Sequence, residues 1–342
     1  MKSFYSDPKY FQSVMLLLAG QRERWKKVQM NKRPLGTTGL EVSEIGFGAW
    51  QLCNSESWGG MDDRTAHRLV HEAIDGGINL FDTAPNYADT KSECILGEAL
   101  ESKRNRVVLV SKFGHTPEGP KVFSVNWFWQ SLEASLRRLR TDYLDVLLLH
   151  NPPMEMYTGT DPLWDAMEKA RVQGKIRHYG ASLDFATEVE ECLANTRSEV
   201  LEILFNVFHQ DVRHSFAAIR AHGAGTIVKV PLDSGWLTGR FDASSRFEGI
   251  RARWSAEEIA RRAELVSRIE WLVSDGSELA HKAIGYLLSY DEVSCVIPGV
   301  RTSEQLESNL AATNHRVSPT ERRKLEAFWD VFTENGSKLL PW

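Results

Sequence analysis

Apolar and polar positions alternate in blocks along the chain from residue 44 onward. Eight blocks are apolar almost throughout, as expected for parallel strands that are buried on both faces. Amphipathic stretches with the period of an α-helix separate them. In the first stretch, Ala66, Leu69, Val70, Ala73 and Ile74 share one helix face before a Gly-Gly pair. The predicted strands cover residues 44–50, 78–84, 107–113, 143–151, 176–182, 200–206, 226–232 and 293–300.

Eight strands, each followed by a helix, predict an α/β fold, the (β/α)8 TIM barrel. An open, doubly wound sheet is the structural alternative, but no G-x-G-x-x-G follows the first strand. Residues 33–43 have strand-like flanks around a Thr-Thr-Gly turn, which predicts an N-terminal β-hairpin that plugs one end of the barrel. Residues 233–276, after the seventh strand, are too long for a plain loop and predict a lid.

The first 29 residues stand apart from this pattern. Their apolar run at residues 14–19 is too short for a secretory signal, and no small-residue cleavage site follows it. We expect residues 1–29 to be an extension, either helical or mobile. Residues 30–342 are expected to form a single barrel domain.

The composition is typical of a globular protein, because 42% of the 342 residues are hydrophobic and 25% are charged. A net charge of −5 without a long single-sign run argues against nucleic acid and anionic membranes as partners. Four scattered cysteines suit a reducing compartment, and no apolar run is long enough to span a membrane. We therefore expect a cytoplasmic protein, either a monomer or a homo-oligomer.

Four titratable side chains lie at or just after the ends of consecutive predicted strands: Asp82, Tyr87, Lys112 and His150. The carboxyl ends of barrel strands meet at one face, so these side chains are expected to converge there. Each has an ordinary alternative, since the acid could cap a helix, the histidine could bond a carbonyl and the lysine could face solvent. Four such groups on consecutive strands favour an active site.

Such a set can protonate an oxygen while a hydride arrives at carbon. The ammonium of Lys112 would lower the pKa of Tyr87, and Asp82 would keep Lys112 charged and in place. His150 could donate a hydrogen bond to a substrate oxygen. The sequence has no metal-ligand spacing, so we expect chemistry without a metal.

The motifs FDTAPNY, VSKFG, LLLHNPP, GKIRHYGAS and IPGVRTSEQLESN resemble, in order and spacing, those of the aldo-keto reductase superfamily, in particular its bacterial-type NADPH-dependent members. The resemblance covers about residues 33–313. It implies a catalytic tetrad of Asp82, Tyr87, Lys112 and His150, with Tyr87 as general acid and base and His150 orienting the carbonyl. It also implies NADPH as the cofactor, which is favoured over NADH.

The same resemblance implies cofactor contacts at several strand ends. Ser182 would meet the nicotinamide carboxamide, residues 231–240 would close over the pyrophosphate, and Arg301 with Ser303 would bind the 2′-phosphate. The implied contacts are Trp50, Ser182, Glu202, Asn206, Lys229, Pro231, Leu232, Ser234, Gly235, Leu237, Gly239, Arg240, Gly299, Arg301, Ser303, Gln305 and Asn309.

The chain departs from the family's pattern at several of its positions. Leu183, Glu202 and Lys229 replace the usual Asn, Gln and stacking aromatic, and Ala88 and Thr90 replace the glycines of a Gly-x-Gly turn. None of these positions belongs to the tetrad. They concern how the cofactor is held and how stiff the loop around Tyr87 is.

Loop aromatics would form the substrate pocket, for which we predict Trp50, Trp58, Phe113, Trp127 and Trp129. These side chains suit sugars, aromatic aldehydes and ketones alike. The leading function is NAD(P)H-dependent reduction of an aldehyde or ketone to an alcohol. The open alternatives are the reverse oxidation of an aldose or alcohol, a nicotinamide-binding regulatory subunit with little turnover, and an unrelated barrel lyase or isomerase.

Overall fold

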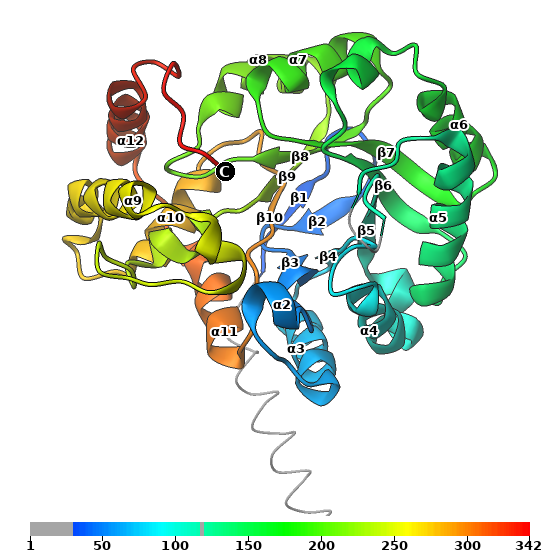
Figure 1. Ribbon diagram of the computed structural model, residues 1–342, viewed down its shortest axis with the longest axis horizontal. Helices are drawn as coiled ribbons and strands as arrows, with labels where there is room; N and C mark the ends of the chain where they lie inside the picture. Colours follow the sequence, from blue (N-terminus) through cyan, green and yellow to red (C-terminus); the bar gives the residue numbers. More distant parts are fainter. Residues whose placement is uncertain (1–29, 117–119) are drawn as a thin grey trace, which may run out of the picture.

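Eight parallel strands form the centre of the computed structural model, which describes residues 30–116 and 120–342 (Figure 1). Each strand pairs with the next, and parallel bridges from Ile45 to Val296 and from Gly48 to Gly299 join the first strand to the last. The predicted barrel is therefore confirmed. Its strands are β3 (Phe47–Gly48), β4 (Leu80–Asp82), β5 (Val108–Phe113), β6 (Leu144–His150), β7 (Ile176–Leu183), β8 (Val200–Leu204), β9 (Gly225–Lys229) and β10 (Cys295–Val296).

Helices surround the strands where the periodicity predicts them. In α3 (Asp63–Asp75) the predicted apolar face is buried, and the Asp62 carboxylate caps the first turn by accepting from the Thr65 backbone N–H at 2.9 Å. The outer layer also contains α4 (Lys91–Leu100), α5 (Val125–Arg138), α6 (Pro162–Val172), α7 (Ala186–Asn195), α8 (Phe216–His222), α10 (Leu279–Leu287), α11 (Ser303–Ala311) and α12 (Pro319–Phe332).

A hairpin closes the amino-terminal end of the barrel. Strands β1 (Lys32–Pro34) and β2 (Glu41–Ser43) pair antiparallel, as predicted. Next to them, Leu35 and Val42 are fully buried and pack with aliphatic side chains of the strands in the barrel interior. The barrel interior is therefore a packed core. It supports the residues at the carboxyl ends of the strands, which lie at the opposite end from the hairpin.

The long connection after β9 forms an insert with its own structure. It contains η6 (Asp233–Thr238), η7 (Gly249–Arg253), α9 (Ala256–Arg268) and η8 (Glu270–Val273). Aromatic rings of Trp236, Phe241, Phe247 and Trp254 pack together inside it. In Figure 1 the insert lies on the side of the barrel opposite α5 and α6.

The insert also reaches across to the segment that follows β3. There η7 contacts α2 (Ser55–Trp58), and Gly249 has a φ of 59°. A Cβ at this glycine would lie 2.4 Å from the Ser57 carbonyl oxygen, so a side chain could not be accommodated at this close approach. The insert is therefore docked across the carboxyl end of the barrel, as expected for the predicted lid.

Residues 1–29, predicted to be a helical or mobile extension, lie outside the described residues. Met30, where the described part begins, packs against the outer core. Across residues 30–116 and 120–342, no helix is both long and apolar enough to cross a membrane.

Candidate active site

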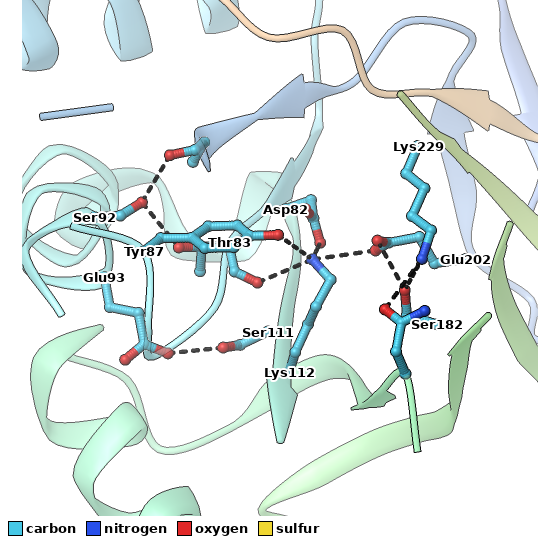
Figure 2. Close-up of polar contacts among 12 residues, drawn as sticks. Asp82, Thr83, Tyr87, Ser92, Glu93, Ser111, Lys112, Ser182, Glu202 and Lys229 are labelled. Carbon is cyan, nitrogen blue, oxygen red and sulfur yellow. Dashed lines mark hydrogen bonds and ion pairs between the residues drawn. The ribbon is translucent and has the colours of Figure 1, made fainter. Parts of the chain in front are cut away.

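The structure brings the four predicted catalytic side chains together at the carboxyl ends of neighbouring strands. Asp82 ends β4, Lys112 lies near the end of β5, His150 ends β6, and Tyr87 lies on the loop between β4 and α4. Lys112 Nζ contacts Asp82 Oδ1 at 2.5 Å and donates to the Tyr87 hydroxyl oxygen at 3.4 Å. These contacts lie in the centre of Figure 2.

A second carboxylate shares the same lysine. Glu202 on β8 places its Oε2 atom 3.2 Å from Lys112 Nζ, and the backbone oxygen of Thr83 also accepts from Lys112 at 3.2 Å. Asp82, Lys112 and Glu202 are all buried. Lys112 is therefore held between two acids rather than paired with Asp82 alone.

Burial and charge together set the protonation of this centre. Burial alone would lower the pKa of Lys112, but Asp82 and Glu202 raise it above its ordinary value, so the lysine is charged. Burial and then the Glu202 carboxylate raise the pKa of Asp82 well above its usual range, against the opposing effect of Lys112. The two acids around Lys112 thus form a place where a proton can be held.

The Tyr87 hydroxyl keeps its proton in this setting. Burial raises the pKa of Tyr87, and Lys112 opposes that rise without cancelling it. The expectation that Lys112 gives Tyr87 a lowered pKa is therefore wrong, because desolvation outweighs the effect of the ammonium group. The Tyr87 hydroxyl can therefore give its proton only to a base that is stronger than its own phenolate.

The loop that carries Tyr87 has an unusual backbone. Ala88, Asp89 and Thr90 have φ values of 51°, 48° and 72°, a left-handed run without glycine. Each such residue costs about 1 kcal/mol relative to a right-handed conformation. The run turns the chain into α4, where Lys91 N donates to the Ala88 carbonyl at 2.9 Å. The structure therefore gives Ala88 and Thr90 the conformation that glycines would adopt with less strain.

His150 lies next to Tyr87, with ring centroids 6.1 Å apart and planes at 82°. Burial and then the charge of Lys112 hold the pKa of His150 well below its ordinary value, so the imidazole is neutral. Its Nδ1 atom is buried without a hydrogen-bond partner among the described residues. A neutral imidazole has one N–H donor, which is what a carbonyl oxygen requires.

A cavity of about 740 Å³ opens above these groups, and Tyr87 and His150 form part of its wall. Of the predicted pocket aromatics, Trp50 and Trp58 line the cavity, with ring centroids 5.1 Å apart. Trp342, which the sequence analysis did not select, also lines it. In Figure 1 the end of the chain lies near β8 and β9, at the edge of the barrel.

The other three predicted aromatics, Phe113, Trp127 and Trp129, lie outside the cavity wall. Phe113 follows Lys112 directly on β5, so its side chain points to the other face of the strand. It packs there against Phe128 of α5, with ring centroids 5.3 Å apart. Trp127 and Trp129 belong to the same helix and pack against the outer core. The substrate pocket as predicted is corrected to this extent.

Most of the predicted cofactor contacts line the cavity. They are Trp50, Glu202, Lys229, Pro231, Leu232, Ser234, Gly235, Arg240, Gly299, Arg301, Gln305 and Asn309. Ser182 is buried directly behind this wall, where its hydroxyl accepts from Lys229 Nζ at 2.8 Å. The structure therefore gathers residues from β3 to α11 around one space.

Four predicted contacts lie elsewhere. The Asn206 amide donates to the Val230 carbonyl at 2.9 Å, Leu237 is buried in the insert, and Gly239 ends η6 outside the wall. Ser303 donates to Glu72 of α3 at 2.6 Å, away from the cavity. In this structure the Asn206 and Ser303 side chains therefore bond to other parts of the protein.

Residues that the prediction did not select complete the wall. Asn151 and Asp184 directly follow β6 and β7. Asn151 was the last residue of its predicted strand, and Asp184 lies two residues beyond the end of its predicted strand. Arg251 comes from η7 in the insert. Its Nε donates to the Ser234 carbonyl at 2.7 Å, and its guanidinium lies 4.8 Å from the Trp58 ring centroid. The sequence of residues 246–255 contains three arginines that could contact phosphate or an anionic substrate or could simply face solvent, and Arg251 is one that lines the cavity.

Hydrogen-bond donors without acceptors gather at the end of the cavity near Arg301 and Arg251. Buried atoms there without a hydrogen-bond partner among the described residues are Trp58 Nε1, Ser234 Oγ and Arg301 Nε. Neither arginine forms an ion pair within the described part of the chain. Burial and the nearby Arg301 lower the pKa of Arg251, which shows how close the two cations are. This end of the cavity has the chemistry of an anion site.

The model of one known protein family, described as aldo/keto reductase, matches residues 44–330 of this chain. The chain belongs to the aldo/keto reductase family. It is an oxidoreductase of this family, and its barrel with a buried tetrad at the carboxyl ends of the strands is the expected arrangement.

Similar proteins include L-galactose dehydrogenase of Arabidopsis thaliana, which is 30% identical over 82% of this chain and 87% of its own length. NADH-specific methylglyoxal reductase of Escherichia coli is 27% identical over 84% of this chain and 95% of its own. Among solved structures, the holo form of aldo-keto reductase AKR11C1 from Bacillus halodurans superposes with a TM-score of 0.74. It is 26% identical, and the match covers 88% of this chain and 96% of the neighbour.

Aldo/keto reductases use nicotinamide cofactors, and the cavity of this aldo/keto reductase fits such a molecule. Arginines without an ion pair among the described residues, and buried donors without a partner there, match phosphate oxygens. Tyr87 and His150 line the same cavity. Arg301, Arg251 and Ser234 would hold the phosphates, and Trp50 and Glu202 would lie near the reacting end.

Proposed function

We propose that this oxidoreductase reduces an aldehyde or ketone to an alcohol with NADPH as the reductant. One arrangement carries the proposal: Lys112 Nζ contacts Asp82 Oδ1 at 2.5 Å and the Tyr87 hydroxyl at 3.4 Å, and Asp82 and Tyr87 line the cavity. NADPH supplies the hydride that the carbonyl carbon receives. Tyr87 then gives the proton that the carbonyl oxygen needs.

The protonation states suit this direction. The raised pKa of Tyr87 keeps its proton in place until the carbonyl oxygen gains the charge of an alkoxide, a stronger base than phenolate. Lys112 stays charged and stabilises the phenolate that the transfer leaves. His150 stays neutral and donates one hydrogen bond to the substrate oxygen. No group in the set needs to change its protonation before the substrate binds.

Turnover tests this function. Purified protein is expected to consume NADPH in the presence of members of a panel of aldoses, aliphatic and aromatic aldehydes, and ketones. Tight NADPH binding, measured by fluorescence titration, without turnover of any panel member would favour a regulatory nicotinamide-binding subunit. Absence of NADPH binding would favour an unrelated barrel lyase or isomerase. Faster oxidation of alcohols or aldoses than reduction of carbonyls would favour the dehydrogenase direction.

The choice between NADPH and NADH tests the anion end of the cavity. Arg301→Ala is expected to raise the dissociation constant of NADPH by roughly 10- to 100-fold, because a charge-assisted hydrogen bond to phosphate contributes about 1.5–3 kcal/mol. The constant for NADH, which lacks the 2′-phosphate, should change much less. The control is Arg246→Ala, which removes an exposed arginine of the insert that lies outside the cavity wall and donates to the carbonyls of Ser244 and Ser245. An equal loss for both cofactors would reject the 2′-phosphate role.

A further inference from the structure

A line made of an ion pair followed by two hydrogen bonds connects Lys112 to the cavity wall. Lys112 Nζ lies 3.2 Å from Glu202 Oε2, and Glu202 Oε1 accepts from the Ser182 hydroxyl at 3.2 Å. The same hydroxyl oxygen accepts from Lys229 Nζ at 2.8 Å. Figure 2 shows these four side chains in sequence, with Lys229 at the end away from Tyr87.

Burial falls along this line. The Lys112 side chain is 0% exposed and Glu202 is 3% exposed, whereas the Lys229 side chain is 13% exposed and lines the cavity. Ser182 between them is fully buried. The line therefore connects a lysine that solvent does not reach with a lysine that it does.

The chemistry of each link permits proton transfer. A hydroxyl can accept and donate at once, and Ser182 does so between Lys229 and Glu202. A carboxylate can accept a proton and, once protonated, can donate a proton to a neighbouring group. A side-chain amide at the same position could not be protonated and deprotonated in this way.

The charged groups around the line support the same role. Glu202 faces Lys112 and Asp82, and the pKa of Asp82 is raised by burial and then by Glu202, so the acids can hold a proton beside Lys112. Lys229 pairs with Asp184 Oδ1 at 2.8 Å. Further titratable groups near this end are Lys121, His115, His150 and His209. Burial lowers the pKa of Lys121 and of His150, and the charge of Lys229 lowers both further.

We propose that Glu202, Ser182 and Lys229 form a relay that returns a proton to Tyr87 through Lys112 after each reduction. This inference rests on the proposed function. While the alcohol product covers the Tyr87 hydroxyl, the phenolate takes a proton from the Lys112 ammonium. The Lys229 ammonium gives a proton to the Ser182 hydroxyl as that hydroxyl gives its own to the Glu202 carboxylate. The protonated Glu202 then returns a proton to neutral Lys112, and solvent reprotonates Lys229. One solvent proton enters, every group ends as it began, and no bond to carbon changes.

The test compares the first turnover with later ones, because the first uses the proton that Tyr87 already holds. The variants Glu202→Gln, Ser182→Ala and Lys229→Met each break one link. Stopped-flow assays in mildly alkaline buffer give the ratio of the steady-state rate to the first-turnover rate. This ratio is expected to fall by about tenfold in each variant. That is less than the roughly 10²- to 10⁴-fold that a general acid or base typically contributes to a rate. In mildly acidic buffer, where protons are abundant, the fall in this ratio should be smaller.

Three further measurements separate a relay from a structural or cofactor-binding role. The double variant Glu202→Gln/Lys229→Met should lower the ratio no further than either single variant, because links in series are not additive. A small weak acid such as imidazolium should raise the ratio for Lys229→Met in proportion to its concentration, by supplying protons at the cavity wall. NADPH dissociation constants measured for each variant keep cofactor binding apart from proton transfer.

Lys121→Met is the matched control. Lys121 donates to the Asn151 carbonyl at 2.9 Å and has the same charge as Lys229, but it lies outside the line. Its ratio should equal that of the wild type. A wild-type protein that turns over carbonyl compounds, together with unchanged ratios in all three variants, would overturn the relay alone. A wild type without turnover would reject the proposed function and the relay with it.

Discussion

Tyr87→Phe is expected to lower carbonyl reduction by about 10³-fold while NADPH binding changes little, because a positioned general acid contributes 10²- to 10⁴-fold. The substitution removes one oxygen atom and leaves the ring, whose centroid lies 6.2 Å from that of Trp50. Lys112 stays paired with Asp82 and Glu202, so the centre should remain folded. The measurements are kcat in a steady-state assay and the NADPH dissociation constant by fluorescence titration.

Tyr157→Phe is the matched control for this change. Tyr157 is fully buried in η4 (Met154–Thr158), outside the cavity wall, and its hydroxyl has no hydrogen-bond partner among the described residues. Removing that hydroxyl should leave kcat unchanged. Near wild-type activity in Tyr87→Phe would show that another group, or water, protonates the product. Equal losses in both variants would point to a general structural effect.

The hydrophobic pattern was sufficient to predict the barrel because its strands are buried on both faces. Such strands have apolar runs bounded by polar loops, and residues 107–113 and 176–182 lie close to β5 and β7 as observed. The strand ends were predicted less accurately. Residues 44–50 and 293–300 were predicted as strands, but β3 and β10 have only two residues each in the structure. Their ladders give way to single bridges where the barrel closes.

The tetrad was predictable because each member is tied to the end of a strand. The pocket aromatics were not, since a strand turns alternate residues to opposite faces. Lys112 points into the centre, so Phe113 must point to the helices; this alternation was present in the sequence and would have excluded Phe113. The prediction for Ser303 failed for another reason. Its hydroxyl donates to Glu72 on α3, and no local sequence pattern shows how α3 and α11 pack together.

The net charge around Lys112 could not be predicted from residue order alone. The sequence showed that Glu202 replaces an amide but not that its carboxylate reaches the same ammonium group as Asp82. Similarly, Arg251 lies in a long insert whose path across the cavity depends on the contact of Gly249 with α2. Both features arise from tertiary packing between segments far apart in the chain.

Lys112→Met is expected to abolish activity and to destabilise the fold by about 3–5 kcal/mol, the usual cost of leaving buried charge without its partner. Asp82 and Glu202 are each 2% exposed, so neither acid can turn to solvent. Without the ammonium, the two acids should take up a proton in the folded state that the unfolded chain releases near its ordinary carboxyl pKa. The folded state then binds more protons than the unfolded state, so stability should fall as pH rises above that value.

Urea unfolding at mildly acidic and mildly alkaline pH measures this effect, and the gap between wild type and Lys112→Met should widen toward alkaline pH. The triple variant Lys112→Met/Asp82→Asn/Glu202→Gln separates stability from catalysis, because it removes the cation and both anions together. Replacing a whole buried ionic group by neutral residues is often close to neutral in free energy, so the triple variant should regain much of the lost stability. It should remain inactive, because Tyr87 no longer has a charged neighbour to stabilise its phenolate. A triple variant as unstable as the single one would mean that Lys112 contributes through packing rather than through its charge.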